Sequence, residues 1–227
     1  AGLVVAALLL RLPPRVDGEP ADPARLEFLP RDGIRELRRH PALVLLVWAL
    51  LPLIVTLESV NAVEVFLLRD VFGASAFQFG LGEAATGAGA VVGAFGAGAV
   101  HGTRRRILVI VICLSLLPVA QIGQGLAPDF LVFLALGSIV GLTLGLSNAL
   151  VFTLLLSILA DTVRARVLAF VGGASRAMGL IALLLGGTLN ATVGPRGAYV
   201  VAGVAGLVAV AVAAVRLRPH LRAGAPP

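Results

Sequence analysis

The sequence predicts an all-α protein built as a polytopic bundle of transmembrane helices. Of its 227 residues, 59% are hydrophobic and only 13% are charged, whereas a soluble domain averages roughly 25% charged residues. The mean hydropathy is +1.01. The apolar residues fall in runs of about 18 or more, the length that spans a bilayer, separated by short charged breaks. A chain of this composition cannot bury its apolar surface in one water-soluble core.

The apolar runs predict one partial span followed by six complete ones. Residues 1–10 are apolar, but at about 1.5 Å per residue they are too short to cross a bilayer. We interpret them as the remnant of a transmembrane helix, and the sequence as a fragment. The six complete spans form a bundle over residues 42–215, and we expect them at 42–68, 76–100, 107–126, 130–159, 167–193 and 197–215.

Two polar segments flank this bundle. Residues 11–41 are predicted to be a cytoplasmic linker whose first part is Pro-rich and extended. In its second part, Ile34 and Leu37 stand three residues apart among charges, which favours a short amphipathic helix on the membrane surface. A solvated tether is the alternative. Residues 216–227 are predicted to be a cytoplasmic tail.

The arginines predict the orientation, because cytoplasmic loops carry the excess of basic residues. One set of alternate breaks holds only Arg69 and Arg196. The other set is therefore expected in the cytoplasm of a cell whose inner (plasma) membrane the chain spans. The net charge of +6 then points to the anionic membrane surface, and not to nucleic acid, as the partner. The cytoplasmic set comprises Arg11, Arg15, Arg25, Arg31, Arg35, Arg38, Arg39, Arg104, Arg105, Arg106, Arg164, Arg166, Arg216, Arg218 and Arg222.

Small residues recur at a spacing of four within two of the expected spans. Gly89 and Gly93 lie in one, and Gly137, Gly141 and Gly145 lie in another. This spacing places the small residues on one helical face, where two backbones can approach closely. We therefore predict tight helix packing at both faces.

Ionisable side chains inside the spans are the candidate functional residues. Glu58, Glu64, Glu83 and Arg176 are expected within the bilayer, where each costs roughly 2.5–3.5 kcal/mol on insertion scales. Each therefore needs a partner, a water-filled cavity or, for an acid, a bound proton. Asn61 shares an arc of about 120° with the two glutamates of its own span.

We expect Glu58 and Glu83 to meet across the hairpin that joins the first two complete spans. Two carboxyl groups in one low-dielectric site cannot both ionise cheaply, so one would bind a proton. Glu64 is expected to reach the outer surface. Arg176 either belongs to the same path or is a structural partner, and the remaining amides, Asn148, Gln121 and Gln124, either line a polar path or bridge helices.

No pattern in the sequence indicates catalysis. It contains no Ser/His/Asp or Cys/His set, no phosphate-binding loop and no metal-ligand spacing. The single cysteine, Cys113, lies in an apolar run and cannot form an intramolecular disulfide. We therefore expect no enzyme activity, no cofactor and no metal.

Several segments resemble one family of transporters. They are REL-RRHP before the first complete span, GAGAVHGTRRR after the second, ADTVRARVLAF before the fifth, and then SRAMGLIALLLGG and GPRGAYVVAG. Over essentially the whole chain, the sequence resembles the C-terminal half, helices seven to twelve, of a major facilitator superfamily transporter. It is most similar to the branch of drug, siderophore and macrolide efflux proteins.

The resemblance implies proton-coupled efflux of amphipathic or drug-like solutes, with the N-terminal half of the same transporter as a partner. It also implies a cytoplasmic gate. The family's Gly/Arg turn usually holds an acid, but none lies between Gly98 and Arg106, so Asp161 is the nearest candidate partner. Uptake of another small solute and a truncated, non-transporting assembly protein are the alternatives. The gate residues are expected to be Arg104, Arg105, Arg106, Asp161, Arg164 and Arg166.

Overall fold

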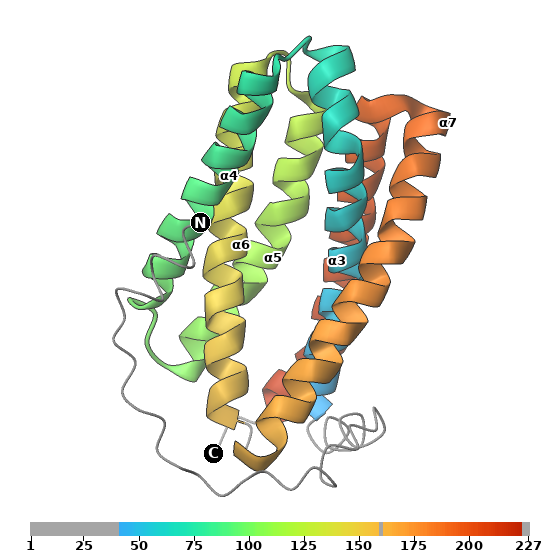
Figure 1. Ribbon diagram of the computed structural model, residues 1–227. Helices are drawn as coiled ribbons and strands as arrows, with labels where there is room; N and C mark the ends of the chain where they lie inside the picture. Colours follow the sequence, from blue (N-terminus) through green and yellow to red (C-terminus); the bar gives the residue numbers. More distant parts are fainter. Residues whose placement is uncertain (1–40, 159–160, 224–227) are drawn as a thin grey trace, which may run out of the picture.

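The structure is a computed structural model that describes residues 41–158 and 161–223. Throughout this part of the chain the elements are helices, which run along one another in an elongated bundle (Figure 1). The prediction of an all-α chain is confirmed there. The predicted helix remnant, the linker up to residue 40 and the last four residues lie outside the described residues. The elements are α3 (Pro41–Phe66), η2 (Leu67–Val71), α4 (Ala76–Ala97), α5 (Thr103–Leu126), α6 (Phe130–Ile158) and α7 (Asp161–Ala223).

Four segments of the described chain are long and apolar enough to cross a membrane. They are Leu51–Val71, Thr103–Leu126, Phe130–Ser157 and Val171–Ala213. Helix α4, which occupies the expected span at 76–100, is not among them, because its many glycines and its Glu83 lower its hydropathy. At about 1.5 Å per residue its 22 residues still measure about 33 Å.

Helix α7 is divided by a turn at Gly194. Its φ of 73° and ψ of 173° are not helical, and a positive φ is open to glycine at little cost. Pro195 follows at the first helical position, where its missing N–H is not needed. The chain folds back at this turn, so that residues 161–193 and 195–223 run in opposite directions (Figure 1). The turn falls between the last two expected spans.

Glycines bring α4 and α6 into backbone contact. A Cβ placed on Gly89 would overlap the carbonyl oxygen of Ser138, and one placed on Gly93 would overlap that of Leu142. In the opposite direction, Gly141 and Gly145 leave no room for a Cβ because they lie against the carbonyl oxygens of Thr86 and Ala90. The tight packing predicted from the four-residue spacing is confirmed for these faces.

The two segments of α7 hold α3 and α5. Ser59 Oγ of α3 donates a hydrogen bond of 3.0 Å to the carbonyl oxygen of Ala182, and Gly186 lies against the same turn of α3. Gly203 lies against α5, where a Cβ would be 2.8 Å from the Pro118 carbonyl oxygen. Close backbone approach thus recurs at both interfaces.

The helix contacts divide the described chain into two units of three helices each, which pack against one another. One unit is α3, α4 and α5, and the other is α6 with the two segments of α7. The first helix of each unit packs against the second helix of the other, and the two third helices pack together. Helices α3 and α6 run in opposite directions (Figure 1). The contacts of one unit are therefore repeated, in reciprocal form, by the other.

Candidate functional site

An acidic pair lies where α3 and α4 approach their connecting turn. Glu64 is seven residues before Val71, where η2 ends, and Glu83 is seven residues after Ala76, where α4 begins. Both carboxyls are therefore about 10 Å from the turn, and their charges interact. Glu64 is half-buried and Glu83 is exposed. Two carboxylates whose charges interact repel each other unless one of them binds a proton.

The expected partner of Glu83 was Glu58, but the carboxyl that the structure brings to Glu83 is that of Glu64. The physical reason is the π-helical turn η2, which extends the helix of α3 as far as Val71. The sequence prediction ended this span at residue 68, so it placed each glutamate about one helical turn too close to the connecting turn. Glu58 is half-buried and accepts a hydrogen bond of 3.5 Å from Nδ2 of Asn61, one turn along the same helix.

An aromatic cluster lies beside the acidic pair. Tyr199 and Phe133 are fully buried, with ring centroids 6.2 Å apart at 64°, and Phe72 lies 5.8 Å from Phe133. The charges of Glu64 and Glu83 both act on the Tyr199 phenol. The Tyr199 hydroxyl has no hydrogen-bond partner among the described residues.

Arg196 closes this cluster at the turn between the two segments of α7. Its guanidinium lies 5.5 Å from the centre of the Phe72 ring, and Nη1 donates to the carbonyl oxygen of Gly125 at 3.5 Å. A guanidinium above an aromatic face gains from the negative charge of the ring face. Arg196 therefore ties the turn to α5 and to the loop before α4.

The other candidate path residues are exposed on the described chain. Asn61 of α3, Asn148 of α6 and Arg176 of α7 are all exposed, as is Glu83 of α4. The structure places them on four different helices and joins only Asn61 to Glu58. Polar side chains are expensive where they face lipid, so these positions call for a protein partner or water.

Helix α5 has the opposite distribution. Beyond its first turn its exposed side chains are all apolar, whereas its glutamines point inward. Gln124 lies near Gly137 of α6, and both polar atoms of Gln121 are buried without a partner among the described residues. The second segment of α7 is also apolar at its exposed positions up to Val215. The exposed residues of α5 beyond its first turn are Leu108, Val111, Ile112, Leu116, Val119 and Leu126.

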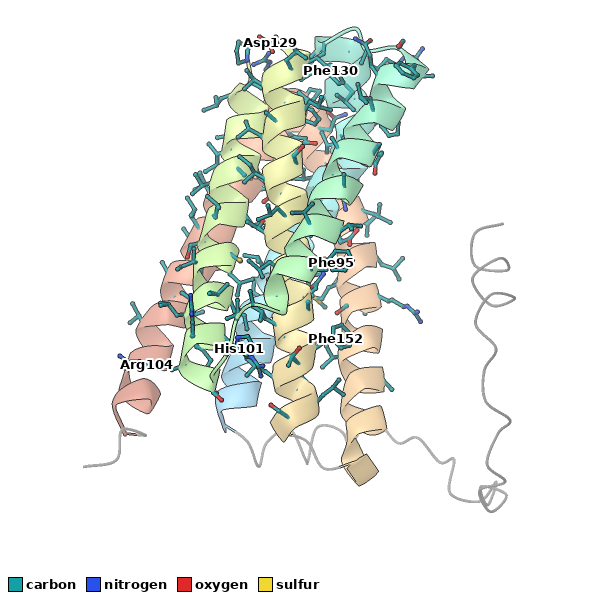
Figure 2. The ribbon with its side chains drawn as sticks, turned by 90° about the vertical axis from the view of Figure 1, so that its left-hand side faces the viewer. Phe95, His101, Arg104, Asp129, Phe130 and Phe152 are labelled. Carbon is teal, nitrogen blue, oxygen red and sulfur yellow. The ribbon has the colours of Figure 1, made fainter. Side chains whose placement is uncertain are left out.

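Arg104, one of the expected gate residues, lies at the end of the bundle opposite Asp129 (Figure 2). Arg104 and Arg105 are exposed, and Arg106 Nε donates a 3.1 Å hydrogen bond to the carbonyl oxygen of Val100. His101 stands beside them (Figure 2). Asp161, Arg164 and Arg166 lie in the first turns of α7, but their side chains are outside those that the structure describes. The expected pairing of Asp161 with these arginines remains a prediction.

Sequence reasoning missed Tyr199 as a site residue and assigned Glu64 to the surface. Tyr199 is the only tyrosine in the chain, which is the one available signal. Its relation to Glu64 and Glu83 depends on packing between segments more than 100 residues apart, which no local pattern encodes.

Comparison with known proteins identifies one family. The sequence model of the Major Facilitator Superfamily matches residues 58–227, about three quarters of the chain. No curated protein matches the sequence, and no solved structure matches it either.

Proposed function

Because the chain belongs to the Major Facilitator Superfamily, a family of membrane transporters, we propose that it is part of a secondary active transporter. In this proposal it exchanges protons for an amphipathic or drug-like solute and exports that solute from the cell. The chain supplies the second half of a twelve-helix fold, with six spans. The expected span at 76–100 is then α4, and the turn at Gly194 separates the last two spans.

One observation carries the proposal: polar side chains are exposed on α3, α4, α6 and the first segment of α7, while α5 and the second segment of α7 expose apolar ones. A helix whose exposed positions are all apolar is suited to face lipid. A membrane helix that exposes an amide, a carboxyl or a guanidinium is suited to face water or another protein unit. The four polar helices would thus form one wall of a solute path, against the other half of the transporter.

The acidic pair supplies the proton coupling in this proposal. Glu64 and Glu83 repel when both are ionised, so proton binding at one of them relieves the repulsion. Glu58, Asn61, Asn148 and Arg176 extend the polar wall along the other helices. In an alternating-access cycle, the path opens to one side of the membrane at a time. The solute would be released when the path opens outward, and the proton would be released when it opens inward, so the two movements are coupled.

Transport driven by an imposed pH gradient tests this proposal. The full-length protein that carries the chain would be reconstituted in vesicles, and efflux of a fluorescent amphipathic cation measured with and without the gradient. Glu64→Gln and Glu83→Gln should each reduce gradient-driven transport by at least about a hundredfold, the lower end of the range for loss of a proton-transfer group. Unchanged coupling in both variants, and in Glu58→Gln, would rule out the proton pathway proposed here.

Orientation and the gate complete the proposal. The arginine-rich end of the bundle would lie in the cytoplasm of the inner (plasma) membrane, as the charge bias favours. Arg105 would pair there with Asp161 when the path is closed on that side. Reversing both charges together should recover part of the activity that each single reversal removes, and no recovery would exclude this pair.

Uptake instead of efflux is the second candidate within the same class, and a truncated, non-transporting assembly protein is the third. The same vesicles distinguish them. Solute accumulation against the opposite gradient would indicate uptake, and no flux in either direction would favour the assembly role.

A further inference from the structure

The Tyr199 hydroxyl is a buried donor without an acceptor. The side chain has no exposed surface, and no described residue forms a hydrogen bond with its oxygen. Most buried polar atoms in proteins do have a partner. The hydroxyl is therefore a group whose hydrogen bond is still to be assigned.

The ring that carries this hydroxyl is held firmly. At Gly125 the backbone of α5 approaches so closely that a Cβ there would be 2.7 Å from the Cβ of Tyr199. Phe133 packs against the ring from α6, and the apolar residues Ala198 and Ala202 belong to the same buried cluster. These contacts hold the ring in place, so an acceptor reaches the hydroxyl by moving its own side chain or through a bound water.

The acidic pair is the acceptor that the surroundings offer. Tyr199 packs in one buried cluster with Val63 and Leu67, which lie one residue before and three residues after Glu64 on the same helix. The charges of Glu64 and Glu83 both act on the phenol from there. Arg196 also belongs to this region, but it is a donor and not an acceptor, and its guanidinium contacts the Gly125 carbonyl oxygen and the Phe72 ring. An ionised carboxylate accepts hydrogen bonds and cannot donate them, so a phenol O–H complements it.

We propose that Tyr199 is the hydrogen-bond donor of the acidic pair and a positioning residue for its proton. Its hydroxyl donates to whichever of Glu64 and Glu83 has released its proton, directly or through one bound water. The bond forms as the carboxyl ionises, so it holds the carboxylate in place for the next proton. This inference rests on the proposed proton coupling at Glu64 and Glu83.

Tyr199→Phe tests the inference because it removes only the oxygen and keeps the ring against Phe133. In the reconstituted protein, gradient-driven turnover should fall about tenfold or more, as expected for a lost hydrogen bond to a charged group. The KM for solute should stay within about twofold. Infrared spectroscopy should show a shift in the C=O band of the protonated carboxyl, the band that Glu64→Gln with Glu83→Gln removes. Phe130→Leu, which alters a ring packed against the same core, should leave that band in place.

The outcomes separate this inference from the function on which it rests. If Tyr199→Phe keeps the parent turnover and infrared band while Glu64→Gln loses coupling, the inference is wrong and the proposed function stands. If neither glutamate variant affects coupling, the proposed function fails first. If Tyr199→Phe lowers the melting temperature equally in the parent and in a background with both Glu64→Ala and Glu83→Ala, the hydroxyl has a structural partner other than the acidic pair, and the inference is overturned.

Discussion

The carboxyl groups of Glu64 and Glu83 lie within electrostatic reach of each other, on two antiparallel helices and at equal distances from the turn that joins them. Natural selection for stability alone does not favour two acids at one place in a membrane bundle, because their charges repel. Such pairs are tolerated where function requires them, at a cost in stability. The hairpin of α3 and α4 thus brings together the two carboxyl groups that the proposed proton binding requires.

Replacing one acid of the pair by a neutral amide should abolish transport without lowering the stability of the protein. Glu64→Gln keeps the shape of the side chain and removes the repulsion on Glu83, so the melting temperature of the purified protein near neutral pH should equal or exceed that of the parent. Glu83→Gln should behave in the same way, while both variants lose gradient-driven transport. Glu58→Gln is the control for the melting temperature alone, since the structure records a contact of Glu58 with Asn61 and not with the pair. A clear loss of stability in both pair variants would show that the acids are held by favourable contacts.

The sequence was sufficient to predict the helical class and the packing faces. Four-residue spacing fixes which glycines share a face, and Gly89 and Gly141 do lie at the contact of α4 with α6. The ends of the helices were harder to predict from the sequence, because a π-helical turn such as Leu67–Val71 has no simple residue pattern. Because the helix end was placed about one turn too early, Glu58 was predicted as the partner of Glu83 in place of Glu64.

Long-range packing set the other limit on prediction. Tyr199 reaches the acidic pair only because Gly125 admits it to the bundle and the turn at Gly194 returns the chain alongside α5. Hydropathy locates each span along the chain, but it does not specify which residues of distant spans meet. The aromatic cluster and its buried hydroxyl therefore became visible only in three dimensions.

Two glycines on α4 provide a matched test of the helix contact. Gly89→Ala would push a methyl group into the Ser138 carbonyl, whereas Gly87→Ala would meet nothing within 4 Å. We expect Gly89→Ala to destabilise the protein by about 1–3 kcal/mol, the usual cost of overpacking. Gly87→Ala should be neutral or stabilise by up to about 1 kcal/mol, because alanine favours helix. Denaturation monitored in detergent or bicelles measures both, and equal stability of the two variants would contradict the backbone contact.

The turn at Gly194 provides a test of backbone conformation. At a φ of 73° and a ψ of 173°, a backbone region used almost only by glycine, a side chain costs roughly 1–3 kcal/mol, so Gly194→Ala should lower the melting temperature. Gly187→Ala is the control, because Gly187 is helical, exposed and has nothing within 4 Å of the added methyl group. If Gly194→Ala is as stable as Gly187→Ala, the two segments of α7 do not require this turn.

Thiol labelling tests which helices face water. Cys113 is buried and is the only cysteine of these 227 residues, so Cys113→Ala removes the one thiol that this chain contributes. Cysteines introduced at Asn148 and Arg176 should react with a charged, membrane-impermeant thiosulfonate. Cysteines at Leu116 and Val119 on α5 should react at least about tenfold more slowly, because a thiol in lipid does not ionise and the reagent does not enter.

A cysteine at Thr103, at the exposed start of α5, controls for the reactivity of that helix and should be labelled readily from its own side of the membrane. Adding a transported solute should slow the reaction at Asn148 and Arg176 if they line its path, and should leave the reaction at Thr103 unchanged. Equal rates at Arg176 and Leu116 would mean that the polar and apolar faces do not differ in their access to water. In that case the distribution of exposed side chains would no longer support a solute path along α3, α4, α6 and α7.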